Sequence, residues 1–224
     1  LVIVALTHES LSENNKWPVS GGANPNGLEN FNQENSHRLR EISNDFKLPS
    51  VSVAVNIRDD IVWSEAQGYA DVAAMVEATT QSVYGVGSIS KPLTTLGMAN
   101  LMQNGKLDID VPVDVYTNAF ANKAYAFTSR QLAAHTSGIQ RPKWDRFIQQ
   151  YFKQKNYTNV EDALELFEDH ALGFEPGTQF HYSSAAYVLL SDVIQKAAGQ
   201  PFLDFMQASV FKPFGMKNTM ADRL

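Results

Sequence analysis

The segment SVSVAVNIRDDIVWSEAQGYAD, residues 50–71, constrains the fold of this chain more than any other stretch. Apolar side chains alternate along it on both sides of a turn predicted at Arg58-Asp59-Asp60, and they are Val51, Val53, Val55, Ile57, Ile61 and Trp63. Period-2 alternation is typical of a half-buried strand, so the segment predicts a β-hairpin. An isolated hairpin is marginally stable and has two exposed edges. Further strands should pair with it, and no such pattern is evident before Leu224, which predicts an incomplete sheet and aggregation at the exposed edge.

The remaining chain has mainly helical spacing. A helix is expected from Phe31 to Phe46, stopped by Pro49, and another from Leu93 to Leu107, ended by Asn104-Gly105. Further helical patterns cover 129–139, 159–172 and 184–199, and a last amphipathic stretch follows Gly199-Gln200-Pro201. The predicted fold class is α/β (α+β), with an antiparallel sheet flanked by helices plus a helical subdomain.

The first 30 residues are expected to be a leader or linker. Residues 7–30 are rich in Asn, Ser, Gly and Pro. The apolar stretch LVIVAL before them fits either the end of a signal segment or an edge strand. Residues 31–224 are expected to form one domain, with a helix and hairpin in 31–87 and a helix-rich part in 88–224.

Composition excludes several function classes. The net charge of −6 offers no basic stripe for nucleic acid. The chain has no cysteine, which excludes disulfides, thiolate nucleophiles and cysteine metal sites. No apolar run approaches the roughly 20 residues that span a bilayer. From the apolar start of the chain and the absence of cysteine we expect an extracytoplasmic (periplasmic or secreted) location, and no cofactor or metal is expected.

Two Ser-x-x-Lys-Pro sequences stand out, one at Ser88 and Lys91 and the other at Ser209 and Lys212. Residues three apart share a helix face, and Pro92 is tolerated only in a first helical turn. Pro92 therefore predicts a helix start near Ser88, where the positive end of the helix dipole faces the hydroxyl. The second pair lies at the end of a helical pattern, where an alkoxide would be disfavoured. Ser88 as a helix cap beside a surface Lys91 is the alternative reading.

A lysine is protonated at neutral pH, so a base role for Lys91 needs either an enclosed site or a partner base. The partner candidate is Tyr182, in FEPGTQFHYSSAAYVLLSDVI, just before a predicted helix. A tyrosine acts as a base only where cations lower its pKa; otherwise Tyr182 is an ordinary half-buried aromatic residue. His135 and Thr136 are interpreted as a hydrogen-bonded brace at a helix end, because no second histidine lies at metal-ligand spacing.

Four segments follow one another in the order GYADV, GVGSISKPLTTLGMANLMQNGKLDIDVPV, LAAHTSGI and FEPGTQFHYSSAAYVLLSDVIQKAAGQPF. Together they resemble the serine β-lactamase and penicillin-binding-protein superfamily, in its class C-like branch of related esterases and peptidases. The resemblance covers about residues 35 to 222. It implies a serine hydrolase that forms an acyl-enzyme on an ester, amide or peptide, with a small molecule or peptide as its substrate and partner. Ser88 would be the nucleophile, Lys91 its proton acceptor or electrostatic partner, and Tyr182 the general base and acid.

The sequence departs from this family pattern at two points. Ser184 stands where the family usually has the Asn of Tyr-x-Asn, and a hydroxyl reaches less far than a carboxamide. Ser184 is therefore expected to contact substrate, but with ester cleavage favoured over amide recognition. The third family motif, Lys-Thr-Gly or His-x-Gly, does not follow Tyr182, so the chain is expected to be truncated at its C-terminus and weak or inactive alone. A non-catalytic binding or scaffold relative of the same fold, and an unrelated mixed α/β protein, remain the alternatives.

Overall fold

The computed structural model describes residues 2–5, 19–23, 29–57, 60–140 and 159–221. The chain divides into two compact units, residues 1–87 and residues 88–224. Within the described residues, no helix combines the length and the apolar character that crossing a bilayer requires.

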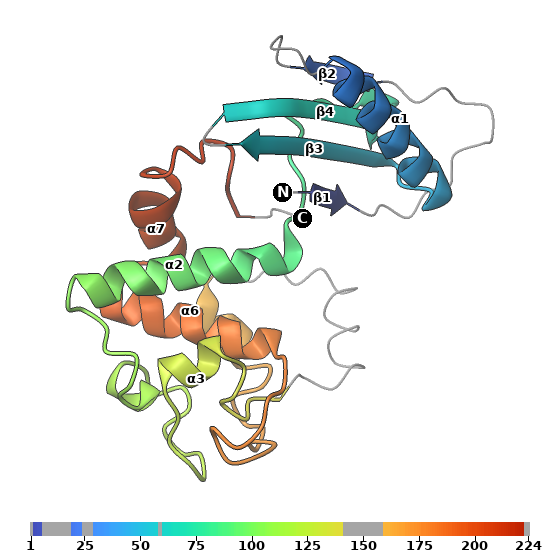
Figure 1. The fold of residues 1–224 in the computed structure, drawn as a ribbon. Helices are drawn as coiled ribbons and strands as arrows, with labels where there is room; N and C mark the ends of the chain where they lie inside the picture. The colour runs from blue at the N-terminus through green and yellow to red at the C-terminus, as the bar shows by residue number, and fades with distance from the viewer. Residues whose placement is uncertain (1, 6–18, 24–28, 58–59, 141–158, 222–224) are drawn as a thin grey trace. The chain divides into compact units, whose positions relative to one another are not determined.

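The first unit is built on an antiparallel five-stranded sheet with the strand order β1-β3-β4-β2, and β5 pairs with β4 (Figure 1). Its strands are β1 (Val2–Ala5), β2 (Val19–Ala23), β3 (Ser50–Ile57), β4 (Asp60–Asp71) and β5 (Val76–Glu77). The register pairs Ile57 with Asp60, which confirms the predicted hairpin. Two residues of its predicted turn, 58 and 59, lie outside the described residues.

Strands β1 and β2 correct the expectation for the N-terminal region. The sequence predicts a leader or linker over residues 19–23, but they form a strand paired with β4, and residues 2–5 at the apolar start of the chain pair as an edge strand with β3. Ser50–Val53 and Trp63–Gln67 therefore have second partners, so the expectation of an exposed hairpin edge is wrong along these stretches. The strand VSGGA has no alternation of apolar and polar residues, so the pattern that predicts a half-buried strand is missing from it.

Helix α1 (Glu29–Asp45) lies against the sheet and contacts β2 and β4 (Figure 1). Its Leu39 is buried with Val51, Val53 and Trp63, which form the core of this unit. The alternation thus places Val51, Val53 and Trp63 inward, as predicted. Ile57 and Ile61, where β3 and β4 meet, are 55% and 59% exposed, so the prediction is wrong at these two positions. The predicted helix is also confirmed, but its last apolar residue, Phe46, lies beyond the end of α1 and is 72% exposed.

The second unit is helical, and α2 packs against α6 at its centre (Figure 1). Its elements are η1 (Gly87–Ile89), α2 (Ser90–Gln103), η2 (Val113–Val115), α3 (Ser129–Ala133), α5 (Val160–Leu164), α6 (Ser184–Ala198), α7 (Phe202–Met206) and the π-helix η3 (Gln207–Phe211). The first residue of η1 closes the preceding unit. The buried apolar side chains of α2, α6, α7 and η3 belong to one core cluster, which includes Leu101, Leu189, Leu190, Met206 and Val210. The observed α2 confirms the helix predicted there, and it ends just before Asn104-Gly105, where Gly105 has a φ of +67°.

Gly97 explains how closely α2 approaches its neighbours. A glycine inside a helix is destabilising by about 1 kcal/mol relative to alanine. Here a Cβ at position 97 would lie 2.7 Å from the Met206 sulfur and 3.2 Å from a Phe205 ring carbon. The absence of a side chain therefore allows α7 to contact α2 directly, which fixes the helix whose first turn carries Lys91 and which directly follows Ser88.

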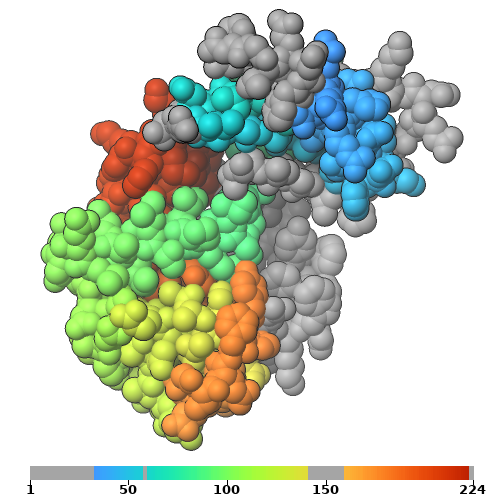
Figure 2. Space-filling model, viewed as in Figure 1, coloured from blue at the N-terminus to red at the C-terminus, as the bar shows by residue number. Residues whose placement is uncertain are grey.

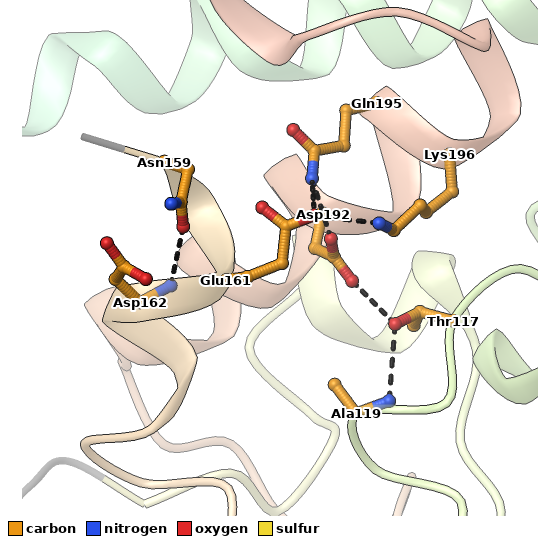
Figure 3. A network of polar contacts seen from close by, with 8 residues as sticks. All are labelled: Thr117, Ala119, Asn159, Glu161, Asp162, Asp192, Gln195 and Lys196. Carbon is orange, nitrogen blue, oxygen red and sulfur yellow. Dashed lines mark hydrogen bonds and ion pairs between the residues drawn. The ribbon is translucent and has the colours of Figure 1, made fainter. Parts of the chain in front are cut away.

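A buried carboxylate ties α6 to the segment after α2. Asp192 is 1% exposed and accepts hydrogen bonds from Thr117 Oγ1 at 2.5 Å and from Gln195 Nε2 at 2.9 Å. Figure 3 shows these contacts beside the ion pair of Glu161 and Lys196, whose side chains are about half exposed. The buried and the exposed contacts thus lie on one face of α6 and differ in their access to water.

Thr117→Val is expected to destabilise the protein by about 1–3 kcal/mol, because it leaves a buried carboxylate oxygen without its donor. Lys196→Met is the matched control. It removes an exposed ion pair, which typically contributes about 0–1 kcal/mol. Urea unfolding of both variants measures the difference. Equal losses of the free energy of unfolding would contradict the assignment of the buried contact as the stronger one.

Candidate active site

The helix start predicted at Ser88 is present as a single 3₁₀ turn that leads into α2. Gly87, with a φ of +50°, opens the turn, and Ser88 is its middle residue. Pro92 is the third residue of α2, inside the first turn, where its missing N–H breaks no helical hydrogen bond. Ser88 therefore lies at the N-terminal end of a four-turn helix, and its side chain is exposed.

The structure brings together all four site residues that the sequence predicted. Ser88 Oγ lies 2.6 Å from Tyr182 Oη, although the two residues are 94 positions apart. Lys91 Nζ donates to Ser88 Oγ at 3.2 Å and to Ser184 Oγ at 3.3 Å. The ammonium group of Lys91 thus touches hydroxyls from both helix N-termini, those of α2 and α6.

Tyr182 lies in the extended segment just before α6. Ser183 caps this helix, because its side chain accepts a hydrogen bond from the Ala186 amide, and Ser184 is the first helical residue. The hydrogen bond from Lys91, then that with Ser88, and also the Lys91 charge lower the pKa of Tyr182 below its ordinary value. Lys91 Nζ also lies 4.9 Å from the centroid of the Tyr182 ring. This environment favours the phenolate, as a tyrosine base requires.

His135 is the residue of this site that sequence analysis did not place there. The predicted hydrogen-bonded brace is confirmed, because Thr136 N–H donates to Gln131 O and Thr136 O accepts from Gly177 N–H. However, the His135 ring also lies on Tyr182, with 4.5 Å between the ring centroids. No local pattern indicates this contact, since it joins the end of α3 to a segment more than 40 residues later.

The segments carrying His135 and Tyr182 run side by side. Backbone hydrogen bonds connect Gly173 N to Gly138 O, Gly177 N to Thr136 O and His181 N to His135 O. Figure 2 shows these stretches, yellow and orange, lying against each other on the surface of the second unit. Among the described residues, no group of three or more His, Asp or Glu side chains is placed to hold a metal ion.

The second Ser-x-x-Lys pair provides an internal comparison. Ser209 lies in η3, and Lys212 follows directly after that element as its C-terminal cap. The predicted helix end is thereby confirmed. The same spacing therefore occurs at a helix start in one copy and at a helix end in the other, where the dipole disfavours an anion.

The Beta-lactamase family model matches residues 36–223. The chain belongs to the Beta-lactamase family. The predicted superfamily of serine β-lactamases and penicillin-binding proteins is thus confirmed, together with the mixed fold of helices and antiparallel sheet.

Three relatives illustrate this Beta-lactamase membership. The human mitochondrial serine beta-lactamase-like protein LACTB is 28% identical over 82% of this chain and 45% of its own length. A penicillin-binding protein of Bacillus subtilis is 33% identical over 71% of this chain and 35% of its own length. The octameric penicillin-binding protein homologue of Pyrococcus abyssi superposes with a TM-score of 0.73 and 27% identity, covering 83% of this chain and 43% of that chain. The chain thus spans less than half the length of these relatives.

Proposed function

We propose that the protein is a serine hydrolase that cleaves an ester, amide or peptide through a covalent acyl-enzyme on Ser88. The observation that carries the proposal is the position of Ser88 Oγ, 2.6 Å from Tyr182 Oη and 3.2 Å from Lys91 Nζ. A hydroxyl is a weak nucleophile that needs an adjacent base. Membership in the Beta-lactamase family supports serine hydrolase chemistry in general.

In the acylation step, Ser88 Oγ attacks the substrate carbonyl carbon while its proton passes to the phenolate oxygen of Tyr182. The tetrahedral intermediate then collapses, the bond to the leaving group breaks, and Tyr182 returns the proton to the departing alcohol or amine. Lys91 stays protonated and stabilises the negative charge that moves between the two oxygens. The first transfer spans the 2.6 Å between Ser88 Oγ and Tyr182 Oη, within the heavy-atom distances of about 2.6–3.2 Å that proton transfer needs.

In the deacylation step, a water molecule attacks the ester carbonyl and gives its proton to Tyr182, and Ser88 leaves with that proton. The negative carbonyl oxygen of each tetrahedral intermediate needs fixed donors. We assign one of them to the Ser88 amide, at the start of the helical segment, where N–H groups have no partner within the helix. The dipole of α2 adds to this stabilisation.

Ser184 is proposed to contact the substrate and to favour esters over amides. Its hydroxyl already accepts from Lys91 at 3.3 Å, and it has fewer fixed donors than a carboxamide. Ser184→Asn is therefore expected to raise the rate of amide hydrolysis relative to ester hydrolysis, by about fivefold for one added hydrogen bond of about 1 kcal/mol. The ratio of kcat/KM for a matched ester and anilide measures this effect, and a ratio that moves toward the ester would contradict it.

The decisive experiment is covalent labelling. The protein and its Ser88→Ala variant are incubated with a fluorophosphonate ester, and their intact masses are determined. A single adduct on the wild type that is lost in the variant supports the hydrolase. A folded, full-length protein that forms no adduct and turns over no ester or peptide would instead support a non-catalytic binding or scaffold relative, which the serine in place of the usual asparagine favours.

The predicted extracytoplasmic location remains part of the proposal. One relative carries the word mitochondrial in its name, while another is a bacterial penicillin-binding protein. Fractionation of cells that express the tagged full-length protein would decide between these compartments.

A further inference from the structure

We propose that His135 is a positioning residue that forms hydrogen bonds with the chain on both sides of Tyr182 and so holds the Tyr182 hydroxyl against Ser88. The inference rests on the proposed function of Ser88 and Tyr182. It concerns a residue that makes no described contact with the nucleophile and would act through Tyr182 alone.

The two residues that flank Tyr182 each donate a backbone hydrogen bond to His135. The His181 amide donates to the His135 carbonyl oxygen at 2.9 Å. The Ser183 amide donates to the His135 imidazole Nδ1 at 3.2 Å. The amides of the residues before and after Tyr182 are thus both fixed to a single residue, which restricts the backbone between them.

The ring of His135 also contacts the rings of two tyrosines. The centroid of the His135 ring lies 4.5 Å from that of Tyr182 and 5.2 Å from that of Tyr187. Tyr187 is itself anchored, because its hydroxyl donates to the Ala133 carbonyl oxygen at 3.0 Å. His135 therefore contacts two aromatic rings of the α6 region and limits rotation of the Tyr182 ring as well as movement of its backbone.

The backbone conformation of His135 allows its carbonyl oxygen and its Nδ1 to accept hydrogen bonds from the same segment, residues 181–183. Its φ of +59° is in the left-handed region, which residues other than glycine seldom adopt, although asparagine, aspartate and histidine are enriched there. This conformation follows directly after α3 and turns the chain toward residues 181–183. Glycine would adopt it more easily but has no side-chain acceptor, so a histidine at this position combines a left-handed backbone with a function for its ring.

The Ser183 contact also defines the protonation state of the ring. Nδ1 can accept a hydrogen bond only when it carries no proton, so the imidazole must be neutral with its proton on Nε2. Burial, followed by the charge of Lys91, lowers the pKa of His135 below its ordinary value. Neutral pH therefore leaves the acceptor intact beside a cationic lysine.

Three variants of the full-length protein separate the two features of His135. His135→Asn retains an acceptor on Cγ and tolerates the left-handed backbone. His135→Phe retains a ring but has no acceptor. Thr128→Ala is the matched control, because it removes the capping box at the opposite end of α3 without touching residues 181–183. Thermal unfolding of each variant verifies that it is folded.

The first readout is hydrolysis of p-nitrophenyl acetate. We expect His135→Phe to lower kcat by about tenfold to a hundredfold with little change in KM, because a displacement of about 1 Å at a reacting group costs a factor of this size. His135→Asn and Thr128→Ala should retain most of the wild-type kcat. Equal losses in the Phe and Asn variants, or an unchanged kcat in the Phe variant, would overturn the assignment.

The second readout does not depend on activity. Tyrosinate formation is followed by ultraviolet difference titration against Tyr182→Phe. Tyr182 should titrate below the ordinary value of about 10 in the wild type and move toward it in His135→Phe, as its hydroxyl leaves Lys91 and Ser88. An unchanged titration would overturn the proposal.

A third measurement uses the wild type, so it remains decisive even where a variant does not fold. Nitrogen NMR of the imidazole should show a neutral ring with its proton on Nε2 at neutral pH, and a proton on Nδ1 would overturn the proposal. Failure of the hydrolase assignment is distinguishable from failure of this inference. Hydrolysis that survives Ser88→Ala refutes the first, while the titration and the tautomer test the second.

Discussion

Replacing Ser88 with alanine is expected to reduce ester hydrolysis by about 10⁴-fold or more and to abolish labelling by a fluorophosphonate. Removing the nucleophile of a serine hydrolase eliminates the covalent route, and only binding and oxyanion stabilisation of a water attack remain. The folded state should be nearly unaffected, because the Ser88 side chain is exposed and contributes no apolar burial. Steady-state kinetics with p-nitrophenyl acetate, together with the intact mass after labelling, measure both effects.

Ser209→Ala is the matched control for this prediction. Ser209 has the same Ser-x-x-Lys-Pro sequence but lies in the π-helix η3, at the end of a helical segment. Activity and labelling should remain at the wild-type level in this variant. If instead Ser88→Ala retained its activity, or both variants lost it equally, the assignment of Ser88 as the nucleophile would be wrong.

Local patterns were sufficient for the parts of the fold that local interactions determine. The alternation in residues 50–71 predicts β3 and β4, since a two-residue connection makes their pairing a neighbour effect. Pro92 and Asn104-Gly105 bracket α2 because proline and glycine act on their own turn of the chain. Both elements follow from residues within one stretch.

The parts that the sequence did not predict depend on contacts between distant segments. Strand β2 is a five-residue stretch with two glycines, and its pairing with β4 joins residues 40 to 48 positions apart. Phe46 follows helical spacing but lies after the last residue of α1, so periodicity alone overestimated its burial. Neither result can be obtained without knowing which surfaces meet.

The candidate site shows the same division. Ser88, Lys91, Tyr182 and Ser184 were identified from a spacing, a helix start and a family resemblance, and the structure places them within hydrogen-bonding distance. The contact of His135 with the Tyr182 segment needs a positive φ and a pairing of two loops, neither of which a histidine in isolation indicates. Residues that do chemistry have characteristic neighbours in sequence, whereas residues that position them are defined by the fold.

Lys91→Met is expected to produce the second-largest loss, about 10²–10⁴-fold in kcat/KM, the range that one acid–base partner typically contributes. Lys91 supplies the hydrogen bond and the charge that lower the pKa of Tyr182. A tyrosine base is active as the phenolate, so wild-type kcat/KM should rise as the pH rises through this lowered pKa. Without the ammonium group the pKa of Tyr182 moves back toward about 10, and the rise should occur at higher pH.

The pH profile, rather than the loss of rate alone, distinguishes this mechanism from simple damage to the site. Lys91→Met should recover part of its activity at alkaline pH, where the phenolate forms without help from a cation. Lys212→Met removes the lysine of the other Ser-x-x-Lys pair and should leave both the rate and the profile unchanged. A Lys91→Met profile that falls uniformly at every pH, with no displacement, would mean that Lys91 acts on Ser88 directly and that the lowered pKa of Tyr182 has no part in catalysis.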